Sequence, residues 1–154
     1  MIAVIQRVKR SSVRIDGELV GECGHGLMIL LGVADGDEKT DAEALAAKIS
    51  KLRIFSDSND KMNLSVKDVE GEMLVVSNFT LLANYAKGNR PDYLNSAPPA
   101  IANELYDYFV SLVKQEVKHV GQGVFGGDME VSIVNDGPVT IVMDSRVLTA
   151  KNKK

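Results

Sequence analysis

The apolar residues of the chain fall into short runs typical of strands and into two longer stretches with helical spacing. Residues 1–8 form a β-rich run, and residues 12–15 alternate between polar and apolar side chains. Asp16-Gly17 is the two-residue signal of a type I′ turn, which predicts that residues 18–22 fold back as a hairpin. The uninterrupted apolar run 27–33 suits a strand buried on both faces, because it is short for a helix.

Two segments repeat apolar residues every three or four positions. In the first, Thr40 and Glu43 have the spacing of a capping box, and the periodicity predicts a helix from Asp41 to Leu52. In the second, Pro98-Pro99 suits a helix start, and the pattern predicts a helix that continues to about Val117. The apolar face expected of this second helix consists of Ile101, Leu105, Tyr108 and Leu112.

The remaining apolar runs are strands. Residues 72–77 form one strand, and the polar stretch 83–95 that follows soon afterwards is expected to be a long surface loop. Residues 129–134 and 139–143 are two strands, separated by the turn-forming tetrad Asn135-Asp136-Gly137-Pro138. Two principal helices are too few for strict alternation with the strands, so the order predicts an α+β fold with mainly antiparallel pairing.

Composition agrees with one globular domain. The chain has 154 residues, of which 45% are hydrophobic and 25% charged, which is near the average of globular domains. We expect a single domain over residues 1–148 and a basic tail over residues 149–154. The longest uncharged apolar stretch, 27–34, is far too short to span a bilayer, and Cys23 is the only cysteine, so we expect a soluble, cytoplasmic protein without a membrane partner.

The formal net charge of −3 argues against a broad, non-specific grip on nucleic acid. Basic residues nevertheless cluster at both ends of the chain: Arg7, Lys9, Arg10 and Arg14 near its start, and Lys151, Lys153 and Lys154 at its end. These clusters are either solvated charges beside a strand and along a tail, or a surface for nucleic acid.

The common catalytic and cofactor motifs are not expected to operate here. Cys23, His25 and His119 are the only cysteine and histidine residues, too few for a typical zinc site and without a specific nucleophile spacing. Residues 121–126 match a G-x-G-x-x-G pattern, but they lie after a helix and before a strand, the reverse of a dinucleotide-binding context. We therefore expect neither a metal nor a cofactor.

Two segments place polar groups at the end of strongly apolar strands. They are Ser77-Asn78-Phe79-Thr80-Leu81 and Asn135-Asp136-Gly137-Pro138-Val139-Thr140. Taken alone, they predict only a strand end and a hairpin turn. The second contains Gly137-Pro138, a bond type for which the cis form costs little.

Together with residues 1–8 and 123–129, these segments resemble the signature of the D-aminoacyl-tRNA deacylases, and the similarity extends from Met1 to about Leu148. Asn78 stands where that family usually has Gln, and Asn89 stands where a second Arg is common. The resemblance implies an α+β fold whose antiparallel sheets form a barrel-like roll with two principal helices. It also implies a homodimer that acts on tRNA carrying a D-amino acid or glycine and cleaves the ester, without a cofactor.

The resemblance further implies roles for individual residues. Gly137 and Pro138, joined by a cis bond, would enter the partner subunit's pocket and reject L-amino acids, while Ser77 and Asn78 would bind substrate. Arg7 would hold the Gly137-Pro138 loop through backbone carbonyls, or would simply belong to the basic cluster. Supporting positions in the same segments are Met129 and Asn135.

Catalysis would reside at Phe79 and Thr80. The Thr80 hydroxyl could be a nucleophile, but no general base is evident beside it. We favour the backbone N–H groups of Phe79 and Thr80 as an oxyanion hole, with water or the substrate's 2′-hydroxyl as the attacking group. Two other functions stay open: a non-enzymatic homodimeric module that binds nucleic acid, and a hydrolase of small esters.

Overall fold

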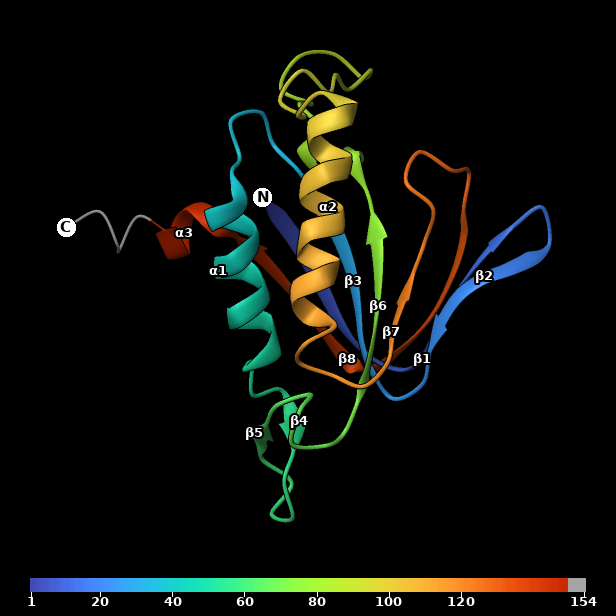
Figure 1. Ribbon diagram of the computed structural model, residues 1–154, viewed down its shortest axis with the longest axis vertical. Coiled ribbons are helices and arrows are strands. Elements are labelled where there is room, and N and C mark those ends of the chain that lie inside the picture. The colour runs from blue at the N-terminus through green and yellow to red at the C-terminus, as the bar shows by residue number, and fades with distance from the viewer. Residues whose placement is uncertain (150–154) are drawn as a thin grey trace.

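The computed structural model describes residues 1–149, in which eight strands, three α-helices and one short 3₁₀ helix follow one another (Figure 1). In chain order these elements are β1 (Ile2–Ile15), β2 (Glu18–Cys23), β3 (Gly26–Gly32), α1 (Lys39–Ser50), β4 (Phe55–Ser56), β5 (Met62–Leu64), β6 (Glu72–Ser77), η1 (Phe79–Leu82), α2 (Pro99–Val113), β7 (Val120–Gln122), β8 (Glu130–Asp144) and α3 (Ser145–Thr149).

Strand β1 organises the main sheet, because three other strands pair with it. Strand β3 pairs antiparallel with its first half and β2 with its second half, while β8 pairs antiparallel along the other edge. Strands β6 and β7 then add in parallel beside β3, which gives the order β2-β1-β3-β6-β7. The pairing is mixed but mainly antiparallel, as the α+β prediction expected.

The predicted hairpin between β1 and β2 is confirmed. Asp16 and Gly17 both have positive φ, 49° and 81°, as a type I′ turn requires. Residue Ile15 pairs with Glu18 across this two-residue turn.

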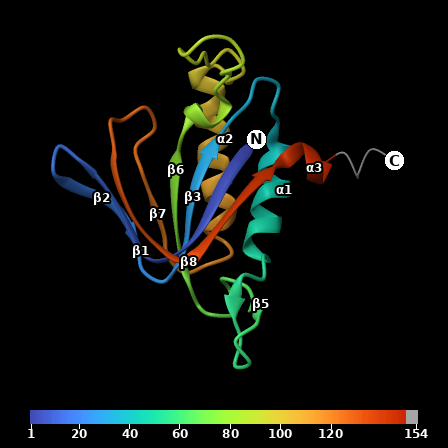
Figure 2. The same cartoon turned by 180° about the vertical axis from the view of Figure 1, so that it is seen from behind.

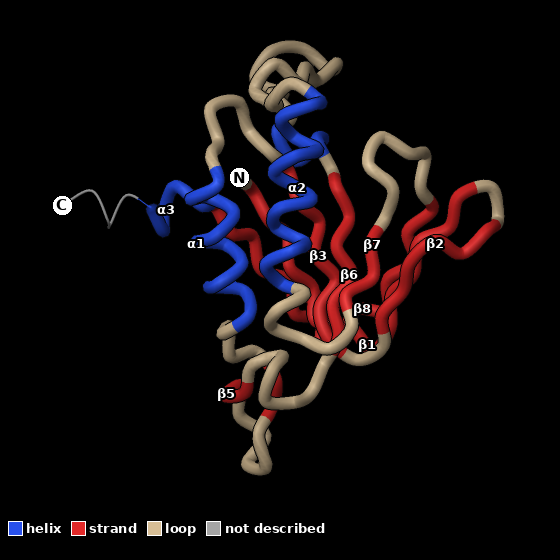
Figure 3. The backbone as a smooth tube through the Cα atoms, in the orientation of Figure 1, coloured by secondary structure: helices blue, strands red, loops and turns tan. Residues whose placement is uncertain are grey.

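The sheet curls until its outer strands β2 and β7 nearly meet, which produces the barrel-like roll (Figures 1 and 3). Two glycines permit this approach. A Cβ atom on Gly21 would collide with the carbonyl oxygen of Gln122, and one on Gly121 would collide with that of Glu22. Only residues without a side chain allow backbones to come this close.

Two apolar cores lie on the two faces of the sheet. Helices α1 and α2 lie side by side over one face (Figure 1), and the view from behind shows the other face without them (Figure 2). Strand β3 contributes to both cores, since Leu27 and Ile29 pack towards the helices while Met28 packs inside the roll with Leu74 and Cys23. The prediction that this strand is buried on both faces is therefore confirmed.

The start of α1 differs from the prediction. Thr40 and Glu43 lie inside the helix, which begins at Lys39. The capping box is formed by Glu38 and Asp41 instead, and the Glu38 N–H donates to Asp41 Oδ2 at 2.9 Å. Both pairs have the same three-residue spacing, so the spacing alone could not decide between them.

Helix α2 begins at Pro99 as predicted, but it ends at Val113 rather than near Val117, and its buried face shares only Leu105 with the predicted one. Ile101 is 47% exposed, so the predicted stripe is only partly buried. The Tyr106 hydroxyl donates to the Val75 carbonyl oxygen at 2.8 Å, and burial raises the pKa of this tyrosine to about 12. The face that packs on the sheet consists of Leu105, Tyr106, Phe109, Val110 and Val113.

The turn predicted at Asn135–Pro138 is wrong, because β8 continues through these residues. Both flanking segments pair antiparallel with β1, so they run in the same direction and no hairpin forms. Val8 pairs with Asn135 and Gln6 pairs with Thr140, which leaves Arg7 opposite the segment 136–139. The tetrad therefore builds a bulge in a continuous strand.

The predicted basic tail falls almost entirely outside the described residues. Thr149 closes α3, whereas Lys151, Lys153 and Lys154 lie beyond residue 149. Within residues 1–149, none of the helices is long and apolar enough to cross a membrane.

Candidate functional site

The first predicted site segment lies where β6 gives way to η1. The Asn78 N–H donates to the Leu31 carbonyl oxygen at 2.8 Å, which holds this junction against β3. Asn78 has an extended backbone and occupies the N-cap of η1, a position that asparagine favours. The segment faces solvent beyond this cap, with Phe79 58% exposed and its ring edge-on to Tyr93 at 5.0 Å between centroids.

The Asn78 side chain engages Thr80 twice. Its Oδ1 atom accepts a hydrogen bond from the Thr80 N–H at 3.2 Å and another from the Thr80 hydroxyl at 2.5 Å. An amide oxygen is not a general base, so this contact orients the hydroxyl without activating it. The Thr80 N–H, one of the two donors expected of an oxyanion hole, is therefore already engaged within the chain.

The second predicted segment is the bulge of β8, in which the Gly137–Pro138 peptide bond is cis. Gly137 has a φ of +130°, a conformation that L side chains rarely adopt. A Cβ atom there would lie 2.9 Å from Val139 Cγ2 and 3.1 Å from Arg7 Nη2. The position therefore requires glycine both for its backbone and for its contacts.

Arg7 holds this bulge from the opposite strand. Its Nε donates to the Asp136 carbonyl oxygen at 3.2 Å and lies 3.4 Å from Oδ2 of the same residue, while Nη1 donates to the Ile54 carbonyl oxygen at 2.7 Å. The Arg7 side chain is only 13% exposed, whereas Lys9, Arg10 and Arg14 are exposed. Arg7 thus ties the bulge to the segment between α1 and β4.

Asn135 and Met129 lie in different surroundings. The Asn135 amide nitrogen donates to the Val139 carbonyl oxygen at 3.2 Å and so bridges the bulge, while its Oδ1 is buried without a hydrogen-bond partner in the described chain. A Cβ atom on Gly123 would lie 2.6 Å from Met129 Sδ and 3.7 Å from Val76 Cγ1, which puts Met129 close to the end of β6.

The structure gathers the predicted residues into two groups and keeps the groups apart. Ser77 pairs with Leu31, which pairs with Ala3, whereas Asn135 pairs with Val8. Val8 lies five positions after Ala3 in β1, and at 3.3–3.4 Å per residue this is about 17 Å along the strand. Within one subunit, the strand end that leads to Thr80 and the bulge that contains Gly137 and Pro138 therefore lie apart along the sheet.

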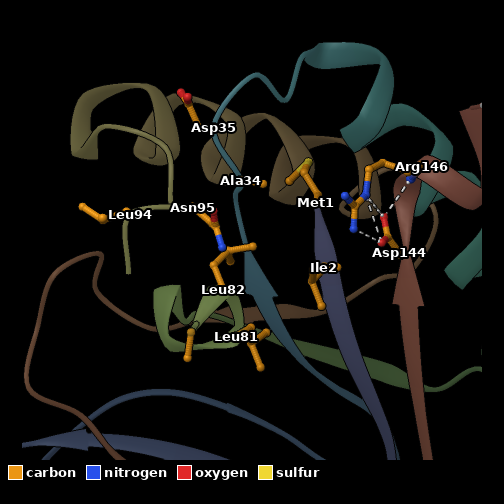
Figure 4. A pocket seen from close by; sticks show the side chains of 11 residues that line it. Met1, Ile2, Ala34, Asp35, Leu81, Leu82, Leu94, Asn95, Asp144 and Arg146 are labelled. Carbon is orange, nitrogen blue, oxygen red and sulfur yellow. Dashed lines mark hydrogen bonds and ion pairs between the residues drawn. The ribbon is translucent and has the colours of Figure 1, made fainter. Parts of the chain in front are cut away.

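A cavity of about 530 Å³ adjoins η1 (Figure 4). Leu81 and Leu82 of η1 line it together with Met1 and the ion pair between Asp144 and Arg146, whose atoms approach to 2.6 Å. None of the residues predicted for the site lines this cavity.

The cysteine and histidine residues form no alternative centre. Burial, with a smaller effect of Glu72, raises the pKa of the Cys23 thiol to about 12, so it stays protonated at neutral pH. His25 packs edge-on against Phe55, and its ring centroid is 5.2 Å from that of Phe55. Within residues 1–149, no three His, Cys, Asp or Glu side chains are placed to share a metal ion.

Fold and site together define a single-domain α+β protein whose polar site elements are mainly backbone groups at a strand end and at a bulge. The model of the D-Tyr-tRNA(Tyr) deacylase family matches residues 4–144, and the chain belongs to this family.

Similar proteins agree over nearly the whole chain. Proteins named D-aminoacyl-tRNA deacylase from Dehalococcoides mccartyi and Caldicellulosiruptor saccharolyticus are 56% and 54% identical to it over 146 residues. These matches cover 95% of this chain, and 95% and 98% of the relatives. A solved structure named c-Myc DNA Unwinding Element Binding Protein is 39% identical, with a TM-score of 0.88 over 94% of this chain and 98% of that chain.

Sequence reasoning missed two parts of the site. The Asn78–Thr80 contact could have been found, because Asn followed two residues later by Thr at a strand end is a local turn and capping signal. The Ile54 carbonyl oxygen that Arg7 binds could not, because 47 positions separate the two residues and no local pattern marks the contact.

Proposed function

We propose that the protein hydrolyses the ester that joins a D-amino acid to the terminal ribose of tRNA. The observation that carries this proposal is the match, over 95% of both chains, to a relative named D-aminoacyl-tRNA deacylase, which spans both site segments. Water adds to the ester carbonyl and the bond to the ribose oxygen breaks. The amino acid leaves as a carboxylate, and the ribose oxygen takes a proton.

The ester carbonyl would lie at the start of η1. Its oxygen gains negative charge as water adds, and the Phe79 and Thr80 N–H groups are the donors that would stabilise it. Because Thr80 N–H donates to Asn78 Oδ1 at 3.2 Å, the substrate oxygen must replace the asparagine oxygen. Asn78 would then close the empty site and open it when substrate binds.

The Gly137–Pro138 bulge would act in a second copy of the chain. The offset of about 17 Å along β1 between the levels of Ser77 and Asn135 keeps the η1 half and the bulge half of each subunit's site apart. A two-fold axis can place the η1 half of one subunit against the bulge half of its partner. In this arrangement the Gly137 and Pro138 carbonyls meet the substrate's amino group, and an L side chain would collide with them. Glycine has no side chain to collide, so glycyl-tRNA, including glycine mischarged on tRNA(Ala), would also be cleaved.

We assign the dimer interface to the sheet face opposite the helices, at the part where β3, β1 and β8 lie side by side. Val4 pairs with Val142 on one side and with Leu30 on the other, which makes a row of apolar side chains across three strands. Val142 is 70% exposed, so this row ends in an apolar side chain open to solvent. A second copy would bury this row, and the same patch would meet itself across the axis.

The decisive assay compares release of D-tyrosine and of L-tyrosine from charged tRNA. In the cell, we expect the protein to act in the cytoplasm. We expect rapid release of the D-amino acid and little release of the L-amino acid beyond spontaneous hydrolysis. Equal rates for both, or no release above the uncatalysed rate, would reject the proposal.

The shared site can be tested by mixing subunits. Thr80→Pro removes one N–H donor from η1, and Gly137→Ala distorts the bulge, so each homodimer should be inactive or nearly so. After random exchange, half of the dimers are mixed and each has one intact site, which restores about a quarter of the wild-type sites. Sedimentation of an active monomer, or no recovery despite demonstrated subunit exchange, would overturn the dimer.

The relative named for binding a DNA unwinding element keeps a second function open, that of a nucleic-acid-binding module without turnover. The same assay separates the two functions. A binding module would protect D-aminoacyl-tRNA from spontaneous hydrolysis, whereas a deacylase would release the amino acid. A hydrolase of small esters would instead cleave a D-amino-acid ester that lacks tRNA at a comparable rate.

A further inference from the structure

The loop between Asn84 and Asp92 has a fixed base. Asn84 and Asp92 exchange backbone hydrogen bonds of 2.8 and 3.0 Å, and the Asn84 side-chain nitrogen donates to Asp92 Oδ2 at 3.1 Å. The Asn84 side-chain oxygen accepts from the Ala86 N–H at 3.2 Å, which fixes the chain on either side of Tyr85. Gly88, with a φ of +65°, supports the bend within the loop.

This fixed loop presents one aromatic ring and two cations to solvent. Tyr85 is 80% exposed and stacks on no other ring within residues 1–149. Lys87 and Arg90 are exposed and form no ion pair with any described residue. The acid closest in the loop, Asp92, already accepts hydrogen bonds from Asn84 and from the Leu94 N–H. The loop is therefore a basic, aromatic surface on a chain whose net charge is −3.

The loop also lies near the candidate site. Tyr85 lies only five positions after Thr80, so their Cα atoms are at most about 18 Å apart. Figure 1 shows the loop at the same end of the molecule as the end of β6 and the start of α2. A substrate ester at Thr80 would place the terminal ribose there, and the nucleotides before it would pass within reach of the loop.

We propose that the loop Asn84–Asp92 binds the unpaired 3′ end of tRNA, with Tyr85 stacking on a base and Lys87 and Arg90 contacting phosphates. This inference rests on the proposed function, because it takes tRNA as the substrate. Base stacking on aromatic rings combined with positive charge is the usual way in which proteins hold single-stranded nucleic acid.

The experiment measures the dissociation constant of uncharged tRNA and of the same tRNA trimmed of its unpaired 3′ nucleotides. The wild type should bind the full tRNA more tightly. Tyr85→Ala should weaken binding of the full tRNA by about 5- to 140-fold, which corresponds to the loss of one stacked base, and should bring the two constants together. Tyr85→Phe keeps the ring and should rescue the affinity.

The charge contacts are tested through salt. In the double variant Lys87→Gln/Arg90→Gln, the plot of log Kd against log salt concentration should be shallower by about 1.4, the effect of two phosphate contacts with a single strand. The matched control is Lys51→Gln/Lys61→Gln, which removes two exposed cations that form no ion pair with a described residue, one just after α1 and one between β4 and β5. This control should keep the wild-type slope.

The outcomes separate this inference from the proposed function. If the wild type releases D-tyrosine from tRNA but Tyr85→Ala still distinguishes full from trimmed tRNA, the loop does not bind the 3′ end and the inference fails. An equal change in the salt slope for the control pair would show that the slope reports only the net charge of the protein, and this result would also overturn the inference. If the wild type binds full tRNA through Tyr85 but releases no amino acid, the proposed hydrolysis fails while the loop inference stands.

Discussion

Replacing Arg7 by methionine tests whether this side chain holds the bulge of β8. The change keeps most of the length of the side chain but removes two hydrogen bonds to backbone carbonyls, at 2.7 Å to Ile54 and 3.2 Å to Asp136. A hydrogen bond to a charged group contributes about 1.5–3 kcal/mol to stability. The ion pair with the Asp136 carboxylate adds less, because that side chain is 31% exposed and solvent screens it.

We therefore expect Arg7→Met to lower the free energy of unfolding by about 3–6 kcal/mol, the sum of the two hydrogen bonds to the charged guanidinium. Urea titration would measure this value, and D-aminoacyl-tRNA deacylation would report whether the Gly137 carbonyl has moved. Arg14→Met is the matched control, because Arg14 lies on the same strand but is exposed and makes one hydrogen bond, to the Gly17 carbonyl oxygen. It should cost less than about 0.5 kcal/mol. If both variants unfold within 1 kcal/mol of the wild type, Arg7 does not hold the bulge.

Three further outcomes follow from the contacts. Gly137→Ala should destabilise the fold by about 2–4 kcal/mol in urea titration, because the residue has a φ of +130° and the new Cβ would contact Arg7. The control Gly36→Ala, at a φ of +83° but with open space around the new Cβ, should cost about 1 kcal/mol. Thr80→Ala should keep kcat within tenfold because both backbone donors remain, and a loss of several orders of magnitude would make the hydroxyl the nucleophile. Burial raises the pKa of the Cys23 thiol to about 12, so the native protein should resist iodoacetamide at pH 8. The free energy of unfolding should fall as pH rises from about 9 towards 12, because in this range the thiol ionises only in the unfolded chain.

The parts of the fold that could be predicted depend on neighbours in sequence. The β1–β2 hairpin follows from Asp16-Gly17, since a two-residue turn with positive φ is a property of those residues alone. The burial of β3 on both faces follows from its apolar run. The first residues of α2 follow from Pro99, which cannot donate the hydrogen bond that a helix interior needs.

The face of α2 could not be predicted with the same certainty. A stripe through Ile101 and Tyr108 and a stripe through Tyr106 and Phe109 both have helical spacing, and the sequence contains both. The structure selects the second, and the Tyr106 hydroxyl donates to the carbonyl oxygen of Val75 across the interface. Which stripe is buried depends on the surface of the sheet against which the helix packs, and the sequence of the helix alone does not contain this information.

The bulge at Asn135–Pro138 shows the same limit at the candidate site. Turn-forming residues allow the chain to deviate from a regular strand, but they do not decide whether it reverses or only bulges. Here both flanks pair with one strand, and Arg7 fills the space opposite the bulge. The reversal was excluded by a contact 129 positions away, which turn chemistry cannot reveal.

Strand β1 determines the spacing on which the proposed mechanism depends. Its first residues pair with the end of β3 that supports η1, and its residue Arg7 holds the bulge of β8. Both halves of the candidate site are thus attached to one hydrogen-bonded strand, in which Arg7 lies four positions after Ala3. No loop or hinge lies between them, so the two halves could not approach each other without breaking the pairing of β1. A conformational change within one subunit is therefore a much more costly way to complete the site than the association of two subunits, which leaves every strand intact.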